Sequence, residues 1–282
     1  MNQLPRLPED GFPSETSPGL DAVPELSVVI PAYNEAGAIL PLVKEVAAVL
    51  DGRLSYEIVV VDDASADGTA DTLKAAAEVL PRLRVLRHRR RFGQSGALLS
   101  GVRAARAAWI ATMDGDGQND PKDLLRLWQE RLERPEVEMI CGVRARRKDN
   151  LTKRLASRVA NGVRKRILKD DMTDTGCGLK LIERRLYLSL PPFDHMHRFL
   201  PALARAHGTV PQTLEVGHRP RQAGSSKYGI LDRLAQGVVD LLGVWWLTRR
   251  RLVPKGTEVA PPRAAHSSAV GIGKSESSPA GD

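Results

Sequence analysis

The residues best suited to chemistry lie together at positions 112–121, whose sequence is TMDGDGQNDP. Asp114, Asp116 and Gln118 alternate along this stretch, so a turn can direct two carboxylates and one amide oxygen towards the same point. The intervening glycines let a ligand approach the backbone closely. Hard oxygen donors in an open cluster suit Mg²⁺ or Mn²⁺, which fill their other positions with water and substrate phosphates. The stretch therefore predicts a site for a divalent metal and a diphosphate; the alternative is a solvated acidic turn.

The chain around these residues alternates between short apolar runs and segments with helical spacing. The run at residues 57–61 is almost continuously apolar, as expected for a strand covered on both faces. Repeated strand and helix units predict an α/β fold, with a mostly parallel sheet flanked by helices. We expect strands at residues 26–30, 57–61, 83–87, 109–113 and 137–141, and helices at residues 36–50, 67–80, 94–107 and 120–133.

Polar residues follow three of these expected strands. The sequence PAYNE stands at residues 31–35, DDAS at residues 62–65, and the acidic stretch follows the fourth strand. Ligands of parallel sheets bind beyond the carboxyl ends of the strands. Neither a dinucleotide glycine fingerprint nor a Walker-type lysine loop is present in the sequence. The phosphates of a ligand would therefore be held by a metal and by basic side chains.

Composition predicts one folded domain with an anionic partner. The 282 residues carry a formal net charge of +8. Cys141 and Cys177 lie far apart, so we expect buried thiols in a reducing compartment, although one disulfide remains possible. Residues 1–24 and 255–282 are rich in proline or serine and predict a disordered leader and a disordered tail. The leader has no apolar core of a secretory signal, so a cytoplasmic protein is expected.

Several ordered segments resemble the family 2 glycosyltransferases of the GT-A fold. Those segments are residues 27–35 (SVVIPAYNE), 59–69 (VVVDDASADGT) and 113–118 (MDGDGQ). Residues 116–121 (DGQNDP), 174–180 (DTGCGLK) and 221–228 (RQAGSSKY) are similar to the dolichol-phosphate mannosyltransferase-like branch, whose members use polyprenyl phosphate acceptors. The resemblance runs from about residue 26 to residue 247. It implies a GT-A domain at residues 25–228 that moves a sugar, with inversion, from a GDP- or UDP-sugar to undecaprenyl or dolichyl phosphate.

The resemblance also implies roles for single residues. The nucleotide-sugar pocket would be lined by Pro31, Tyr33, Glu35, Asp63 and Asp114. The metal, Mg²⁺ or Mn²⁺, would be held by Asp114, Asp116 and Gln118. A mobile loop would close Arg221, Ser226 and Lys227 over the diphosphate, so the expected catalytic residues are Asp116, Arg221 and Lys227.

Other interpretations remain open for some of these positions. Glu35 could support the turn, Tyr33 could be a packing aromatic, and Ser226 could cap a helix. One departure from the family pattern is Arg91, where an asparagine is expected before the sequence FGQS. Residues 87–91 (RHRRR) either touch the nucleotide or form a solvated rim, and the rim interpretation is favoured.

Residues 144–169 form a strongly basic segment. Basic side chains without interleaved aromatics fit a phosphate-rich partner better than single-stranded nucleic acid, so no nucleic-acid partner is expected. Arg144 and Arg158 match positions where relatives hold phosphate, and Arg198, within the sequence HRFLP, is a further candidate for an acceptor phosphate. The segment could also lie on an anionic membrane or be a solvated helix packed on the sheet, and Arg198 could instead cap a helix or pair with an acid.

Residues 229–254 predict an amphipathic helix that is too short and too interrupted by Asp240 to span a bilayer. Trp245, Trp246 and the arginines at residues 249–251 are typical of an interfacial helix on an anionic membrane surface. A peripheral enzyme on the inner face of the cell membrane is therefore expected. The alternative is a core helix that closes the domain.

Three functions remain open from the sequence. The leading one is sugar transfer to a polyprenyl phosphate, whose phosphate oxygen is already anionic and requires no general base. A family 2 transferase that acts on a hydroxyl of a glycan or lipid would need such a base, and none is identified. The third is a non-catalytic binder of anionic membranes or nucleic acid, which the intact Asp116, Gln118, Arg221 and Lys227 disfavour.

Overall fold

The computed structural model describes residues 22–144, 162, 164–168, 170, 172, 174–220 and 230–250, with the backbone alone for residues 230–236. Its strands are β1 (Leu26–Ala32), β2 (Tyr56–Asp62), β3 (Leu83–Arg87), β4 (Trp109–Thr112), β5 (Met139–Arg144), β6 (Lys180–Glu183) and β7 (Gln212–Val216). Its helices are α1 (Ala36–Leu50), α2 (Thr69–Val79), α3 (Gly93–Ala104), α4 (Lys122–Glu133), α6 (Arg184–Ser189), the 3₁₀ helix η1 (Met196–Arg198), α7 (Leu200–Ala206) and α8 (Ile230–Arg249). The expected leader up to residue 21, the expected tail, Arg158, Arg221, Ser226 and Lys227 lie outside the described residues.

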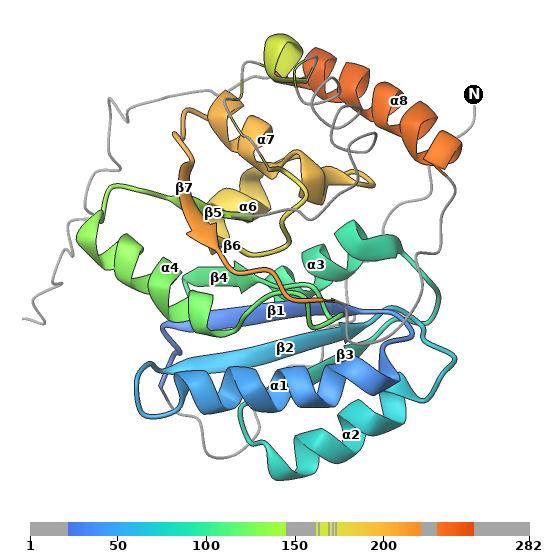
Figure 1. Ribbon diagram of the computed structural model, residues 1–282, viewed down its shortest axis with the longest axis vertical. Helices are drawn as coiled ribbons and strands as arrows, with labels where there is room; N and C mark the ends of the chain where they lie inside the picture. Colours follow the sequence, from blue (N-terminus) through green and yellow to red (C-terminus); the bar gives the residue numbers. More distant parts are fainter. Residues whose placement is uncertain are drawn as a thin grey trace, which may run out of the picture. The chain divides into compact units, whose positions relative to one another are not determined.

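The seven strands form one mixed sheet in the order β3-β2-β1-β4-β6-β5-β7 (Figure 1). The four strands of the first half, β3, β2, β1 and β4, are parallel to one another. Strand β6 is antiparallel to both β4 and β5, while β5 and β7 are parallel. The expected mostly parallel sheet is therefore confirmed, with β6 as the reversed strand.

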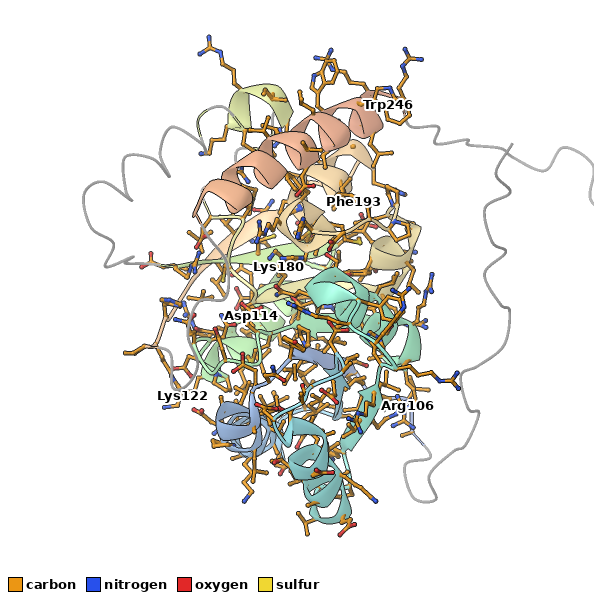
Figure 2. All side chains as sticks on the ribbon, turned by 90° about the vertical axis from the view of Figure 1, so that its right-hand side faces the viewer. Arg106, Asp114, Lys122, Lys180, Phe193 and Trp246 are labelled. Carbon is orange, nitrogen blue, oxygen red and sulfur yellow. The ribbon has the colours of Figure 1, made fainter. Side chains whose placement is uncertain are left out.

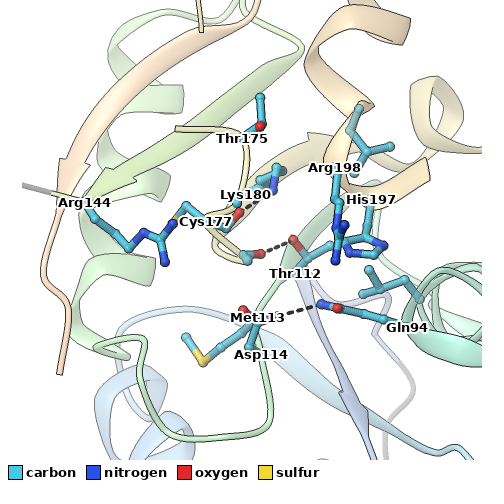
Figure 3. A pocket seen from close by; sticks show the side chains of 14 residues that line it. Gln94, Thr112, Met113, Asp114, Arg144, Thr175, Cys177, Lys180, His197 and Arg198 are labelled. Carbon is cyan, nitrogen blue, oxygen red and sulfur yellow. Dashed lines mark hydrogen bonds between the residues drawn. The ribbon is translucent and has the colours of Figure 1, made fainter. Parts of the chain in front are cut away.

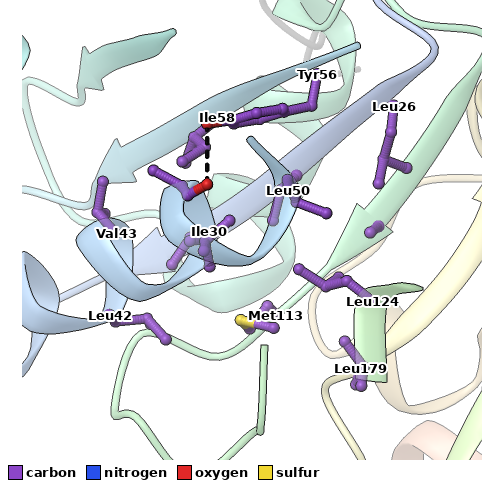
Figure 4. Close-up of a cluster of buried hydrophobic side chains, with 14 of the residues drawn as sticks. Leu26, Ile30, Leu42, Val43, Leu50, Tyr56, Ile58, Met113, Leu124 and Leu179 are labelled. Atoms are coloured by element: carbon purple, nitrogen blue, oxygen red, sulfur yellow. Dashed lines mark hydrogen bonds between the residues drawn. The ribbon is translucent and has the colours of Figure 1, made fainter. Parts of the chain in front are cut away.

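Helices cover both faces of the sheet because alternate strand residues point to opposite faces. In β1, Val28 and Ile30 join a core cluster with residues of α1, α2 and α4, whereas Val29 joins a second cluster with α3, α6 and α7. Figure 4 shows the first cluster around Ile30 and Met113. Met113 stands directly after β4 and is fully buried, so the end of this strand is anchored in the core.

Helix α8 packs on the second cluster through one side. Val244 is buried there, and Asp240 lies with its Oδ2 3.0 Å from His195 Nδ1. The opposite side is apolar and exposed, with Val238, Val239, Leu242 and Trp246 from 53% to 69% accessible. Trp246 lies on the outer side of the helix in Figure 2. Among the described helices, none combines the length and the apolar character needed to cross a membrane.

Both cysteines are buried free thiols. Burial raises the pKa of Cys141 to about 12, so this thiol stays protonated. The disulfide left open by the sequence is therefore not formed in this structure, and the expectation of buried thiols is confirmed.

Candidate functional site

Residues 113–121, which we call the acidic loop, lie beyond the carboxyl end of β4, against the end of β1. A Cβ at Gly115 would lie 2.8 Å from the carbonyl oxygen of Pro31, so a larger residue would push the two loops apart. Gly117 has φ +74°, a conformation that favours glycine. The two glycines therefore let the chain turn sharply while keeping Asp114 and Asp116 at the sheet edge.

The side chains of the loop hold its own shape. The amide of Asn119 accepts a hydrogen bond from the backbone N–H of Asp114 at 3.2 Å, and Asp116 Oδ1 accepts one from the N–H of Gln118 at 3.1 Å. Burial and then the negative charge of Asp116 raise the pKa of Asp114 to about 6. The two carboxylates therefore interact unfavourably, and a cation placed between them would relieve the repulsion.

The donor set of this loop fits a hard divalent cation. Within the described parts of the chain, no three His, Cys, Asp or Glu side chains are grouped as metal ligands. The donors that the sequence predicted, the carboxylates of Asp114 and Asp116 and the amide of Gln118, all lie in this loop. Two carboxylates and one amide leave coordination positions for phosphate oxygens, which is the usual arrangement for Mg²⁺ in phosphate-transfer sites.

The segment after β7, residues 217–220, is hydrogen-bonded to the acidic loop. The backbone N–H of Arg219 donates to the carbonyl of Gln118 at 2.9 Å. Its guanidinium pairs with both carboxylate oxygens of Glu45 and with Asp120, each at 2.8 Å. His218 Nε2 lies 3.5 Å from the amide nitrogen of Gln118. The chain therefore enters the segment that carries Arg221, Ser226 and Lys227 from a position directly beside the expected metal ligands.

The loops after β1 and β2 are also joined to each other. The N–H of Asp63 donates to the carbonyl of Ala32 at 2.8 Å. Asn34, with φ 54°, donates its backbone N–H to Ser65 Oγ, and its side-chain oxygen accepts a hydrogen bond from the N–H of Ala66. The N–H of Glu35 donates to Thr69 Oγ1 at 3.0 Å. The structure thus brings together the segments that carry Pro31, Tyr33, Glu35 and Asp63.

Asp63 anchors a third loop, a role that the sequence did not predict. Its carboxylate is almost fully buried and accepts hydrogen bonds from the N–H groups of Phe92 and Gly93, both at 2.8 Å. His88 Nδ1 lies 2.7 Å from the same carboxylate. The loop between β3 and α3 is therefore held against the end of β2.

Arg91, within this loop, stacks on the ring of Tyr33, 4.1 Å from its centroid. The residue is exposed, as the rim interpretation expects, but it covers an aromatic side chain of the expected nucleotide pocket. Tyr33 is half-buried and in contact with a cation.

A cavity of about 330 Å³ lies next to the acidic loop. It is bounded by the end of β4, the start of α3, the segment at residues 175–180 and helix η1. Figure 3 shows polar side chains from all four elements pointing into it. The polar and charged residues that line it include Gln94, Asp114, Arg144, Lys180, His197 and Arg198.

The segment with the sequence DTGCGLK passes very close to Asp114. A Cβ at Gly178 would lie 2.2 Å from Asp114 Oδ2, so no larger residue fits at this position without displacing the carboxylate. The backbone carbonyl of Gly178 accepts a hydrogen bond from Thr112 Oγ1 at 2.6 Å. Gln94 Nε2 donates to Asp114 Oδ1 at 2.7 Å from the opposite side. Asp114 is therefore fixed between α3 and this segment.

Three cations line the cavity. Arg144 is held in a bidentate pair by Asp174, while the Lys180 side chain, 4% exposed, donates to the carbonyl of Cys177. Arg198 is exposed at the edge formed by η1. The structure thus brings the expected phosphate residues Arg144 and Arg198 to one cavity.

His197 also lines the cavity, and it is neutral. Its Nδ1 lies 2.8 Å from Ser95 Oγ, and burial lowers its pKa to about 3. The sequence analysis assigned no role to Gln94, Lys180 or His197. Lys180 stands within a segment that carried the family resemblance, and Gln94 and His197 stand in the sequences FGQS and HRFLP, in which no role was assigned to their side chains.

A mixed sheet with an acidic loop beyond its parallel strands is the architecture of a GT-A glycosyltransferase. The model of the family described as Glycosyl transferase family 2 matches residues 27–190. The chain belongs to this family and is a glycosyltransferase.

Known proteins of similar sequence act on polyprenyl phosphates. Dodecaprenyl-phosphate galacturonate synthase of Rhizobium johnstonii is 38% identical over 240 residues, which cover 82% of this chain and 69% of that protein. Undecaprenyl-phosphate 4-deoxy-4-formamido-L-arabinose transferase of Aeromonas hydrophila is 32% identical over 231 residues, covering 81% and 70%.

The fold is also found in solved structures. Glucosyl-3-phosphoglycerate synthase from Mycobacterium tuberculosis, in complex with Mn²⁺, UDP-glucose and glycerol 3-phosphate, matches with a TM-score of 0.59 and 18% identity over 80% of each chain. At this identity the similarity establishes the GT-A-like fold alone.

Proposed function

We propose that this glycosyltransferase moves a sugar from a nucleoside-diphosphate donor, a GDP- or UDP-sugar, to a polyprenyl phosphate with inversion. The observation that carries the proposal is the cavity in which three cations, Arg144, Lys180 and Arg198, surround the loop of Asp114. Relatives named for dodecaprenyl and undecaprenyl phosphate support this choice of acceptor. A cavity lined by cations, beside an acidic loop whose carboxylates suit a metal ion, fits a reaction in which both substrates carry phosphate.

The donor half of the site consists of the loops after β1, β2 and β4. Tyr33, Glu35, Pro31 and Asp63 would bind the nucleoside, and Asp114, Asp116 and Gln118 would hold Mg²⁺ or Mn²⁺. When bound, the cation neutralises negative charge on the diphosphate. Arg219 holds the preceding segment beside this loop, so that Arg221, Ser226 and Lys227 would reach the same diphosphate.

The acceptor half would be the cationic cavity. Arg144, Arg198 and, outside the described residues, Arg158 would bind the lipid phosphate. Asp174 holds the guanidinium of Arg144 in a fixed plane, which reduces the ordering needed on binding. The phosphate oxygen would attack the anomeric carbon directly, because it is already anionic. The bond between that carbon and the diphosphate oxygen would break, and the nucleoside diphosphate would leave with the electron pair.

A hydroxyl acceptor is less well supported by the cavity. Such an acceptor requires a base within hydrogen-bonding reach. Burial lowers the pKa of His197 to about 3, which makes it a weak base at neutral pH. Asp114, the other candidate lining the cavity, is expected to be occupied by the metal.

We also propose that residues 229–254 form a membrane-associating helix on the inner face of the cell membrane. The exposed apolar side of α8 and the exposed Arg249 and Arg250 at its end support binding to an anionic lipid surface. A lipid acceptor resides in such a surface. Nucleic acid is not an expected partner.

The experiment that tests the proposal measures nucleotide release by the purified full-length protein. The reactions contain Mn²⁺ or Mg²⁺, one donor from a panel of UDP- and GDP-sugars that includes activated galacturonate, and either undecaprenyl phosphate or a glycan. Release that requires the lipid phosphate supports the proposal. Release with glycans alone would show the hydroxyl-acceptor function, and no turnover with any pair would favour a non-catalytic binder.

A further inference from the structure

Arg91 lies over the ring of Tyr33, a residue of the expected nucleotide pocket. Its guanidinium carbon lies 4.1 Å from the centroid of the Tyr33 ring, well within the distance of about 6 Å for a cation–π contact. The contact joins the loop after β3 to the loop after β1.

The backbone around Arg91 is fixed by buried contacts. The next two residues, Phe92 and Gly93, both donate their N–H groups to the carboxylate of Asp63 at 2.8 Å. His88, at the start of the loop, lies 2.7 Å from the same carboxylate and 2.9 Å from Ser100 Oγ. A loop held at both ends has little conformational entropy left to lose when a ligand binds.

We propose that Arg91 binds the nucleoside diphosphate of the donor, and this inference rests on the proposed function. A guanidinium stacked on an aromatic ring keeps its N–H groups directed outwards in its own plane. Those groups are donors only, so the ligand atoms they recognise are acceptors: carbonyl oxygens of the base or oxygens of the phosphates. Tyr33 positions the guanidinium, and Asp63 positions the loop that carries it.

Arg90 provides a matched comparison within the same loop. Its guanidinium stacks on Phe92 at 4.4 Å, a ring that is itself 49% exposed. Replacing Arg90 or Arg91 with alanine removes the same charge and the same kind of stacking contact. Only Arg91 covers a residue of the expected pocket, so a ligand-specific role would separate the two variants.

The test is the affinity of the full-length protein for UDP and GDP in the presence of Mn²⁺, measured by calorimetry. We expect Arg91→Ala to weaken binding of the preferred nucleotide by about tenfold or more, and Arg90→Ala to change it by less than about twofold. Arg91→Lys should restore part of the affinity, because lysine keeps the charge but not the planar fork. Circular dichroism confirms the fold of each variant.

Binding of the nucleoside, the monophosphate and the diphosphate identifies the atoms that Arg91 contacts. A loss of equal size for all three places the contact on the base, whereas a loss that grows with each phosphate places it on the diphosphate. Equal affinities of Arg91→Ala and the wild type, or equal losses in Arg90→Ala and Arg91→Ala, would overturn the inference. Failure of the wild type to bind any nucleotide would instead overturn the proposed function.

Discussion

Arg144 and Asp174 form a planar, two-bonded pair, with Nε 2.6 Å from Oδ2 and Nη2 2.7 Å from Oδ1. The pair connects the last residue of β5 to the segment before β6, and Asp174 raises the pKa of Arg144, which stays charged. Because Arg144 lines the cavity, its pairing with Asp174 determines where this positive charge lies in the proposed acceptor site.

Loss of either Arg144 or Asp174 should therefore lower the catalytic efficiency with the lipid phosphate acceptor. We expect Arg144→Ala to lower kcat/KM for undecaprenyl phosphate by about 100-fold, and Asp174→Asn by about tenfold, because the arginine remains but is less well oriented. Initial rates at varied lipid phosphate measure both effects. Arg134→Ala, which removes the pair between the exposed Arg134 and the half-buried Glu130 of α4, should leave the rates unchanged. Wild-type kinetics in Arg144→Ala would remove this residue from the acceptor site.

Lys180 is the second cation whose loss should be measurable. Its positive charge lowers the pKa of Asp114, opposing the effects of burial and of Asp116. In Lys180→Met the pKa of Asp114 should rise above its value of about 6, so the carboxylate should be protonated more often and bind metal less well. We expect the dissociation constant for Mn²⁺, measured by electron paramagnetic resonance at pH 6.5, to increase by about threefold or more. Lys44→Met, an exposed change on α1, serves as the control.

Asp116→Ala should abolish metal-dependent turnover while the fold remains intact. The side chain accepts a hydrogen bond from the N–H of Gln118 within its own loop and belongs to neither core cluster, so we expect the sheet and both clusters to remain unchanged in the variant. Nucleotide release at saturating Mn²⁺ and the thermal unfolding midpoint measure the two parts of this expectation. Full activity in a folded Asp116→Ala variant would exclude Asp116 as a metal ligand.

His197 should make the protein less stable as the pH falls. The unfolded chain takes up a proton at this residue near the ordinary pKa of 6.5, whereas the folded protein does so only at about 3, because the side chain is buried. The free energy of unfolding should therefore decrease as the pH falls from about 6.5 towards 3. Urea unfolding at several pH values should show a weaker dependence in His197→Gln. A constant stability difference between variant and wild type across this range would contradict the prediction.

The first half of the fold was predictable because its signals are local. Strands β1 and β2 are mostly apolar runs, and the helix at residues 36–50 repeats its apolar residues at helical spacing, so the expected bounds agree closely with the structure. Strand β6 was not predicted, because it has four residues, two of them charged, and exists through pairing with both β4 and β5. Such pairing depends on contacts far apart in the sequence.

The site shows the same division between local motifs and distant contacts. The acidic loop is contiguous, so Asp114, Asp116 and Gln118 could be selected from their spacing alone. The cavity is assembled from α3, the segment before β6 and η1, and no single segment reveals that Gln94, Lys180 and His197 meet there. Asp63 was predicted to contact the nucleoside; its role as an anchor depends on the backbone of Phe92 and Gly93, which only the folded chain brings near.

The exposed side of α8 should bind anionic membranes. Val239 is 69% exposed on the side of α8 that also carries Leu242 and Trp246, and the exposed Arg249 and Arg250 stand at the C-terminal end of this helix. Val239→Glu places a negative charge in this surface, so it should reduce sedimentation with phosphatidylglycerol vesicles by about tenfold. Val79→Glu on α2 is the matched control, since Val79 is 70% exposed and lies on a different helix. Binding should also weaken with added salt, because the salt ions screen the attraction between the arginines and the anionic lipids. Equal binding by Val239→Glu, Val79→Glu and the wild type would show that α8 does not contact the lipid.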